Sequence, residues 1–430
     1  MNFKAIFANK STLDFLAMFS SNIIKKFIGF AKEVILASVF GSSLLYANFI
    51  LIRTVSDLFS QLSNGNALQA NLLSKFSKLY FNNEQISLRQ VRDISKKIMI
   101  LLFALSQLIQ LPIVYYIDSS DYNVLFIFIS LLLGVILCIN FYSSVFLIVM
   151  QGQGKFKTHS IATTVDMFMS TIFLYPFTIY FSVVGILASR LIGFFSMIYK
   201  YLRPIYSMSN GKEAKFKVKD FNISVMLLGN LANVIVIFSR FIAGLDNDNN
   251  ITFFNYSVVL LNALLTAVIL NINTLVLAKL SVKNDIKIIL FSFFVALGLG
   301  ILLVYLVDLY GEITIQFIFQ RGAFTQQDTL STFAYAKDLS ISFVFIFIAS
   351  ALFQPFFSLA QNKIKKDANI LAIIFSIFLV GLFVYFSLYT SSARENSLIT
   401  IYVLSFLFML MSLYSVYRFY KIKIVSSWNL

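Results

Sequence analysis

A chain of 430 residues in which 59% are hydrophobic and only 12% are charged is too apolar for a soluble protein of this size. Its mean hydropathy of +0.84 agrees, so the composition indicates a polytopic membrane protein. The net charge of +15 does not require nucleic-acid binding, because basic cytoplasmic loops give a membrane protein the same excess. Cys138 is the only cysteine, which excludes a framework of internal disulfides.

Apolar segments long enough to cross the hydrocarbon core recur along the whole chain. We therefore predict an all-α membrane fold with twelve transmembrane helices. Pro176 and Pro355 predict kinks in the fifth and tenth spans, because proline lacks an N–H and its ring clashes with the preceding turn. The predicted spans are 11–40, 44–74, 97–117, 122–150, 160–181, 183–202, 221–245, 251–279, 287–308, 329–359, 369–389 and 397–420.

The basic residues predict the orientation, because Lys and Arg of short loops accumulate on the cytoplasmic side. Twenty-five of them fall at the termini or in the loops on the same side, whereas the opposite loops hold only Arg321 and Arg394. We therefore expect both termini to be cytoplasmic and the N-terminus to be retained. The seven remaining basic residues fall within predicted spans and are Lys25, Lys26, Lys32, Arg53, Arg190, Arg240 and Lys337.

A basic, glycine-containing stretch after the sixth span divides the chain into two sets of six spans, the layout of an internally duplicated transporter. We predict an N-terminal six-helix bundle over 1–205, a cytoplasmic linker over 206–220 and a C-terminal six-helix bundle over 221–430. The positive net charge is then explained by the basic cytoplasmic loops, and no nucleic-acid partner is expected.

The charges of the first span are the strongest functional signal, because a charge near the bilayer centre costs at least ~2.5–3.5 kcal/mol and usually faces a bundle interior or watery cavity. Helical periodicity places Lys25 and Lys32 on one face of this helix. Lys26 and Glu33 lie on a neighbouring strip. We predict that all four line a cavity. The alternative is that the lysines reach the membrane interface and Glu33 neutralises one of them.

Other intramembrane charges have two interpretations each. Arg53 either joins the lysines in an anion site, where a guanidinium can bind phosphate bidentately, or pairs with Asp57 four residues away. Arg240 lies toward the external end of the seventh span and either lines the cavity or reaches the outer headgroups. Asp166 and Arg190 lie in adjacent spans and are expected to pair; the sequence does not decide whether this pair also has a functional role.

No pattern in the sequence indicates catalysis. His159 is the only histidine, no cysteine–histidine cluster exists, and no glycine-rich phosphate loop precedes a Lys-Ser or Lys-Thr pair. We therefore expect a transporter and not an enzyme, without a cofactor or metal, driven by an ion gradient, the membrane potential or a substrate gradient.

Two stretches of the first half carry a recognisable motif. The segment from Lys26 to Glu33, followed by Phe40-Gly41, is similar to the S-R-x-L-G-x-x-R-D and F-G of the first helix in the MurJ/MviN family of lipid II flippases. Gly65 and Gln69-Ala70 are similar to the E-G-x-x-x-Q-A run of that family's second helix, with Arg53 at a basic position before it.

A third stretch precedes the tenth predicted span. Phe319-Gln320-Arg321-Gly322-Ala323-Phe324-Thr325, followed by Asp328, closely resembles the F-x-R-G-x-F-(T/D)-x-x-D of the same family. Thr325 and Asp328 also have the spacing of a helix-capping box, which predicts the start of a helix at this point.

The resemblance implies a flippase of the multidrug/oligosaccharidyl-lipid/polysaccharide exporter superfamily in the bacterial inner membrane. Such a protein moves a polyprenyl-diphosphate-linked saccharide, lipid II or a related cell-envelope glycan precursor, by alternating access. Its expected partners are this substrate and membrane lipids, and we expect a monomer. The diphosphate would be held by Lys25, Lys26, Lys32 and Arg53, within a substrate site that also includes Glu33 and Arg240.

Several departures leave the transported glycan open. Val258 and Val259 replace an Asp-Arg pair of the family, and no acid follows Asn369 in the eleventh span, so the family's sodium site is not carried over. Twelve spans without two further helices equally resemble Wzx-type flippases of O-antigen or capsule units. Further alternatives are a cation-coupled drug exporter, which would favour acidic cavity residues, an O-antigen polymerase, which would carry a large external loop, and a scaffold.

Overall fold

The computed structural model is helical apart from one pair of short parallel strands, β1 (Gln85–Ile86) and β2 (Glu213–Ala214), among the residues it describes. These strands lie in the first of the two units defined below. The described residues are 10–63, 68, 72–73, 76–77, 80, 85–117, 123–202, 213–214, 217, 221–246, 248–264, 269, 273, 276, 280, 286–359, 361–388 and 392–425.

The chain divides into two compact units. The first holds Met1–Val39 and Val55–Met226, and the second holds Phe40–Thr54 and Leu227–Leu430. The turn between the first two helices thus belongs to the second unit. The predicted bundle limits around 206–220 stay a prediction, because most of that stretch lies outside the described residues.

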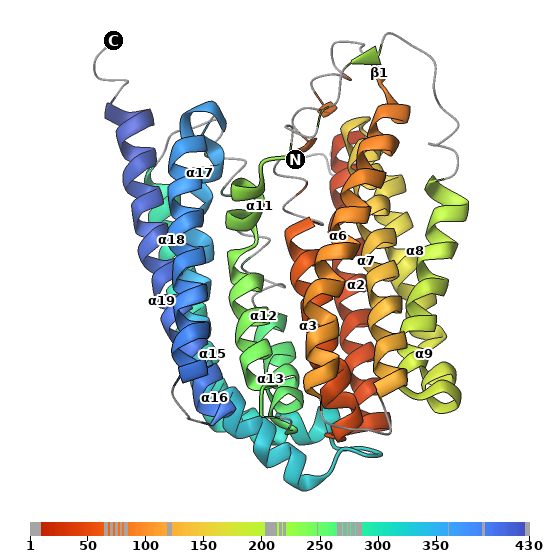
Figure 1. The fold of residues 1–430 in the computed structure, drawn as a ribbon. Helices are drawn as coiled ribbons and strands as arrows, with labels where there is room; N and C mark the ends of the chain where they lie inside the picture. The colour runs from red at the N-terminus through yellow and green to blue at the C-terminus, as the bar shows by residue number, and fades with distance from the viewer. Residues whose placement is uncertain are drawn as a thin grey trace, which may run out of the picture. The chain divides into compact units, whose positions relative to one another are not determined.

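In the first unit, α6 packs against α7 and α8 packs against α9 (Figure 1). Helix α6 begins at Leu88 and not near 97 as predicted, because Ser87 caps it by accepting a hydrogen bond from the Gln90 amide. The core of this unit includes Phe146 and Phe194. Its helices are α2 (Lys10–Phe40) and α3 (Leu44–Ser63), which both extend into the second unit, α6 (Leu88–Tyr116), α7 (Asn123–Gly152), α8 (Phe156–Ile172), α9 (Leu174–Met197) and the π-helix η2 (Ile198–Leu202).

In the second unit, α16 is central: it packs against α13, α15 and α19, and 78% of its most apolar stretch is buried, against 17% for α18. Helix α18 therefore presents most of its apolar surface outward. The helices of this unit are α11 (Ile223–Gly229), whose first turn belongs to the first unit, α12 (Leu231–Ala243), α13 (Asn250–Leu264), α15 (Ile286–Phe319), α16 (Gln326–Leu352), α17 (Gln354–Ser358), α18 (Gln361–Leu388), α19 (Ala393–Phe419) and the π-helix η5 (Tyr420–Val425).

The helices are interrupted next to both prolines for which kinks were predicted. Helix α8 ends at Ile172, the residue whose carbonyl the missing N–H of Pro176 would bond, and Pro355 opens α17 directly after α16. Helix α9 is interrupted at Ser182, which has a φ of 51° and lies between the predicted fifth and sixth spans. The 79° bend between α11 and α12 at Asn230 was not predicted; it follows Gly229, a weak helix former.

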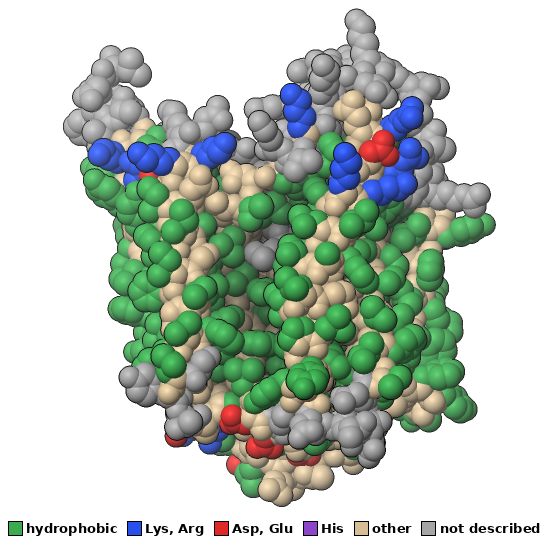
Figure 2. All heavy atoms as spheres, viewed as in Figure 1, with side chains coloured by type: hydrophobic (Ala, Val, Ile, Leu, Met, Phe, Trp, Pro, Cys, Tyr) green, Lys and Arg blue, Asp and Glu red, His purple; other side chains and the backbone are tan. Residues whose placement is uncertain are grey.

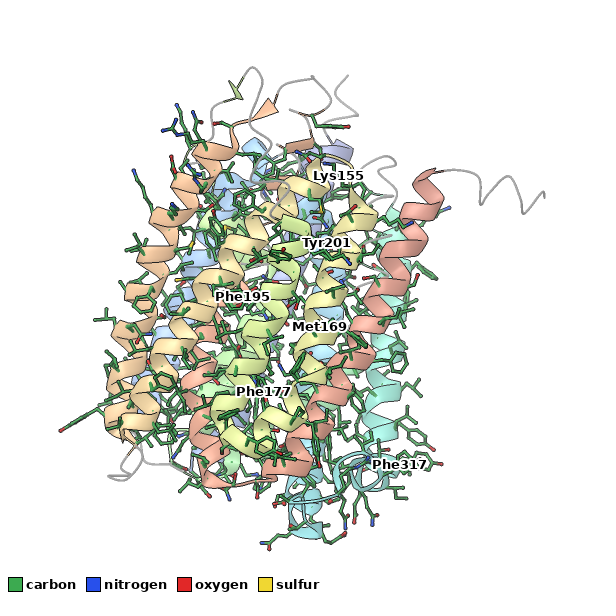
Figure 3. The ribbon with its side chains drawn as sticks, turned by 90° about the vertical axis from the view of Figure 1, so that its right-hand side faces the viewer. Lys155, Met169, Phe177, Phe195, Tyr201 and Phe317 are labelled. Carbon is green, nitrogen blue, oxygen red and sulfur yellow. The ribbon has the colours of Figure 1, made fainter. Side chains whose placement is uncertain are left out.

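Seven described helices are long and apolar enough to cross a membrane, or eight if the bent pair α11–α12 forms one span. The protein is therefore a multi-pass membrane protein, and the predicted total of twelve spans stays a prediction. In Figure 2, hydrophobic side chains cover the flanks of both units, and Lys and Arg side chains gather at the end of the first unit where α6 begins. In Figure 3, Lys155 and Phe177 mark opposite ends of the α8–α9 hairpin.

Candidate functional site

Helix α2 presents a polar face to α8 in the first unit. Ser21 and Lys25 share this face because they are one helical turn apart. The Lys25 Nζ donates to Thr163 Oγ1 at 3.1 Å. Ser21 Oγ donates to the Ser160 carbonyl at 3.1 Å and shares a 2.7 Å hydrogen bond with Thr164 Oγ1. The half-buried Lys25 is therefore held by a hydroxyl and not by a carboxylate.

The same face continues along α2 toward a half-buried ion pair. Gly29 lies against Met167, close enough that a Cβ at this position would be 2.7 Å from the Met167 Cε. One turn further, Lys32 interacts electrostatically with Asp166. Arg190 Nη1 lies 3.2 Å from Asp166 Oδ2, which confirms the predicted contact between the fifth and sixth spans.

Lys26 and Glu33 occupy the neighbouring strip of α2 and are half-buried. Glu33 Oε2 is buried, and within the described part of the chain it has no hydrogen-bond partner. A buried carboxylate oxygen without a donor is expensive in an apolar environment. Among the predicted site residues that the structure describes, Glu33 is the one with a buried side-chain oxygen that lacks a hydrogen-bond partner.

Arg240 and Arg53 belong to the second unit. Arg240 is only 7% exposed, and it ties α12 to two other helices: its Nε donates to Thr54 Oγ1 at 3.0 Å and its Nη1 donates to Asn255 Oδ1 at 2.9 Å. The side chain is therefore directed inward. Arg53, next to Thr54 on α3, is half-buried, and its pairing with Asp57 stays a prediction.

The structure thus groups four predicted site residues on α2 in the first unit, and the two predicted arginines at the α3–α12 contact in the second. Sequence reasoning did not identify the neutral partners Thr163, Thr54 and Asn255. A pair of adjacent threonines at 163–164 inside an apolar span was the one available signal for the first of them.

The motif before the tenth predicted span forms the expected cap. The Thr325 amide donates to Asp328 Oδ2 at 2.7 Å, and the Asp328 amide donates to Thr325 Oγ1 at 3.3 Å, so the predicted capping box at the start of α16 is confirmed. Gly322 has a φ of 61°, a conformation that suits glycine within this turn.

Two motif segments that are far apart in the sequence meet within the second unit. Ser42 Oγ donates to Asp328 Oδ1 at 2.6 Å, and Tyr256 Oη donates to the Gly41 carbonyl at 3.1 Å. Gly41 has a φ of 53°, and a Cβ there would overlap the Ala323 backbone carbonyl. The Phe40-Gly41 turn and the turn before α16 are therefore one structural junction.

No protein-family sequence model matches the chain, and no curated protein matches it in sequence. Solved structures match nearly the whole chain and show that it shares its fold with a lipid II flippase and with a transporter of the multidrug/oligosaccharidyl-lipid/polysaccharide exporter (MOP) superfamily.

Among the solved structures, the lipid II flippase MurJ in an inward closed conformation matches with a TM-score of 0.70 and 18% identity, over 96% of this chain and 90% of the flippase. An outward-facing multidrug resistance MATE transporter of the MOP superfamily matches with a TM-score of 0.56 and 13% identity, over 95% of this chain and 96% of the transporter. A MATE transporter in complex with MaD5 matches with a TM-score of 0.58 and 12% identity, over 96% of this chain and 95% of the transporter. These identities are low, so the likeness establishes the fold.

Proposed function

We propose that the protein is a flippase that translocates a polyprenyl-diphosphate-linked saccharide, lipid II or a related cell-envelope glycan precursor, by alternating access. The observation that carries this proposal is the basic face of α2. Lys25, Lys26 and Lys32 lie on one membrane helix of the first unit, and Lys25 is held by the hydroxyl of Thr163. Amines in such a setting attract an anionic headgroup.

Lys25 is suited to binding phosphate because an ammonium group has three N–H donors and Thr163 accepts only one hydrogen bond from it. A diphosphate supplies strong acceptors for the remaining donors. In the proposed site Lys25, Lys26, Lys32 and Arg53 bind the diphosphate. Glu33 accepts hydrogen bonds from the saccharide, and Arg240 holds the α3 segment beside Arg53 through Thr54.

The setting of the proposed flippase follows from the distribution of charge. It resides as a monomer in the bacterial cytoplasmic membrane with both termini cytoplasmic, and an ion gradient or the membrane potential drives transport. In a variant without Cys138, we expect an impermeant thiol reagent added outside the cell to label a cysteine placed at Gln326. The same reagent should not label a cysteine placed at Lys96, at the basic start of α6.

A Wzx-type flippase of O-antigen or capsule units fits the same site, because both substrates share the diphosphate and differ in the sugar. A MATE-like drug exporter is the second candidate, since multidrug transporters match the chain with TM-scores of 0.56 and 0.58. The lysines of α2 disfavour it, because they would repel a cationic drug.

The test is translocation of a fluorescent lipid-linked saccharide by the purified protein in proteoliposomes. Lys26→Ala should reduce apparent affinity about 10- to 100-fold, the value of one hydrogen bond to a charged group. Lys26→Arg should restore transport because arginine also binds phosphate. Lys97→Ala, at an exposed position of α6, is the matched control and should have no effect. Normal transport by Lys26→Ala, or transport of a cationic dye only, would contradict the proposal.

A further inference from the structure

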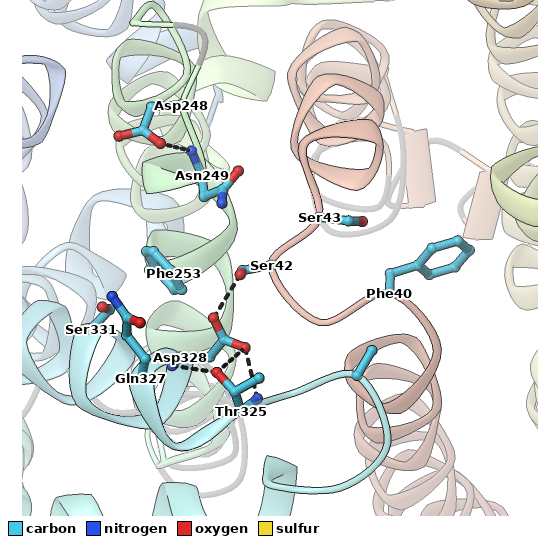
Figure 4. A pocket seen from close by; sticks show the side chains of 11 residues that line it. Phe40, Ser42, Ser43, Asp248, Asn249, Phe253, Thr325, Gln327, Asp328 and Ser331 are labelled. Carbon is cyan, nitrogen blue, oxygen red and sulfur yellow. Dashed lines mark hydrogen bonds between the residues drawn. The ribbon is translucent and has the colours of Figure 1, made fainter.

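A polar cavity lies in the second unit, at the junction of the α2–α3 turn with the starts of α13 and α16 (Figure 4). Its volume of about 640 Å³ is within the range of small-molecule sites, roughly 300–1,000 Å³. The polar side chains that line it include Ser42, Ser43, Asn249, Gln327, Asp328 and Ser331.

We propose that this cavity is a second binding site, which recognises the uncharged sugar residues of the transported lipid-linked glycan. The inference rests on the proposed function and adds a site separate from the basic face of α2. Among the described residues that line the cavity there is no Lys, Arg or His, while Asp248 and Asp328 are present. Two carboxylates repel phosphate, so the ligand is not the diphosphate.

The carboxylates are arranged for hydrogen bonding and not for holding a metal ion. Both oxygens of Asp328 already accept bonds, one from Ser42 and the other from Thr325. Asp248 likewise accepts a hydrogen bond from the backbone N–H of Asn249 at 2.6 Å and another from the side-chain Nδ2 of Asn250 at 3.3 Å. Within the described residues no group of three or more His, Cys, Asp and Glu side chains could hold a metal ion. Their remaining lone pairs suit sugar hydroxyl groups.

The amides of the cavity add the complementary donors. Asn249 and Gln327 each carry an N–H₂ donor and a carbonyl acceptor, the pair of functions that adjacent sugar hydroxyls require. Figure 4 shows these two side chains on either side of the Phe253 ring. An aromatic ring between polar groups offers an apolar surface to the C–H face of a sugar.

The cavity is also pre-organised, because its walls are the two turns that form the motif junction. The capping box and the Ser42–Asp328 hydrogen bond fix the wall that α16 contributes. A site whose polar groups are already held by such bonds loses little entropy when a ligand binds. This is the physical reason to expect binding of a free saccharide and not only of the complete lipid.

The test uses the purified full-length protein in nanodiscs and saturation-transfer NMR with three probes: N,N′-diacetylchitobiose, inorganic diphosphate and tetraphenylphosphonium. Asn249→Ala and Gln327→Ala should each weaken disaccharide binding about 3- to 10-fold, the value of one neutral hydrogen bond, and leave diphosphate binding unchanged. Gln326→Ala is the matched control, because Gln326 is exposed beside Gln327 and does not line the cavity. Lys26→Ala should weaken diphosphate binding and leave disaccharide binding unchanged.

Several results would overturn the inference. The unsubstituted protein could fail to bind the disaccharide. The Asn249→Ala/Gln327→Ala double variant could bind the disaccharide with unchanged affinity. That double variant could also lose binding of tetraphenylphosphonium alone. If the double variant still binds the disaccharide normally while the unsubstituted protein translocates the lipid-linked saccharide, only the cavity assignment fails. Failure of the unsubstituted protein to translocate that lipid contradicts the proposed function, and the disaccharide measurement still decides what the cavity binds.

Discussion

The first unit contains two polar regions of opposite character. Between α3, α6 and α7, neutral side chains form a closed network: Gln107 Nε2 donates to Gln110 Oε1 at 3.2 Å, and Ser130 Oγ donates to Gln107 Oε1 at 3.0 Å. Gln110 Nε2 donates onward to Ser56 Oγ at 2.5 Å. On α2, by contrast, the polar residues include charged side chains, and Glu33 Oε2 has no partner within the described residues.

The difference distinguishes polar residues that hold the helices together from polar residues that serve transport. In the network, Gln110 and Ser130 are fully buried and each makes several hydrogen bonds, so the polar atoms join three helices at little cost. On α2, charged side chains lie in an apolar helix, where a charge costs more free energy than a neutral residue. A substitution in the network should therefore reduce stability, whereas a substitution of an α2 lysine should reduce transport.

The largest effect is expected at the Asp166–Arg190 pair, which borders the charged region. Asp166→Asn removes the carboxylate charge and leaves Arg190, beside Phe194, without its ionic partner. The variant should lose roughly 3 kcal/mol of stability, measured by thermal unfolding in detergent. The double variant Asp166→Leu/Arg190→Met should recover most of it. Failure to recover would mean that the pair has a role beyond helix packing.

Lys25→Met should give the clearest functional loss. It removes one donor to the diphosphate, so apparent substrate affinity should fall about 10- to 100-fold, while the thermal midpoint stays the same or rises because a buried charge is gone. Proteoliposome translocation and unfolding are measured on the same preparation. A lower midpoint together with normal transport would reassign Lys25 to structure.

Gln110→Ala should do the reverse. It removes the hydrogen bond that Gln110 donates to Ser56 and the one that it accepts from Ser130, so the free energy of unfolding should fall about 1–2 kcal/mol while the folded fraction transports normally. Leu111→Ala, at an exposed position next in α6, is the control and should stay within about 0.5 kcal/mol. An equal fall in the free energy of unfolding of Gln110→Ala and Leu111→Ala would show that the hydrogen-bond network adds no stability of its own.

The features that sequence reasoning predicted correctly are local ones. The Thr325–Asp328 capping box depends on a three-residue spacing, and the kinks depend on proline chemistry at Pro176 and Pro355. The face shared by Lys25 and Lys32, which both interact with α8, follows from helical periodicity alone. Each rule involves residues within one or two helical turns, where backbone geometry fixes the neighbours.

The features that sequence reasoning missed depend on distant contacts. Ser42 bonds to Asp328, and Arg240 bonds to Thr54, across long sequence separations. A hydroxyl in an apolar span has many helices that it could face, and only packing selects one. The cavity of the second unit could not be predicted for the same reason, because its lining comes from three separate stretches of the chain.

The smallest predicted effect concerns the hydroxyl that holds Lys25. Thr163→Val keeps the shape of the side chain but removes the acceptor 3.1 Å from Lys25 Nζ, so the amine loses its orientation and keeps its charge. Apparent substrate affinity should fall about threefold, less than for Lys25→Met, and Thr163→Ser should restore it. The Lys25→Met/Thr163→Val double variant should be no worse than Lys25→Met alone, because Thr163 acts only through the lysine. Additive losses would instead place Thr163 in direct contact with the substrate.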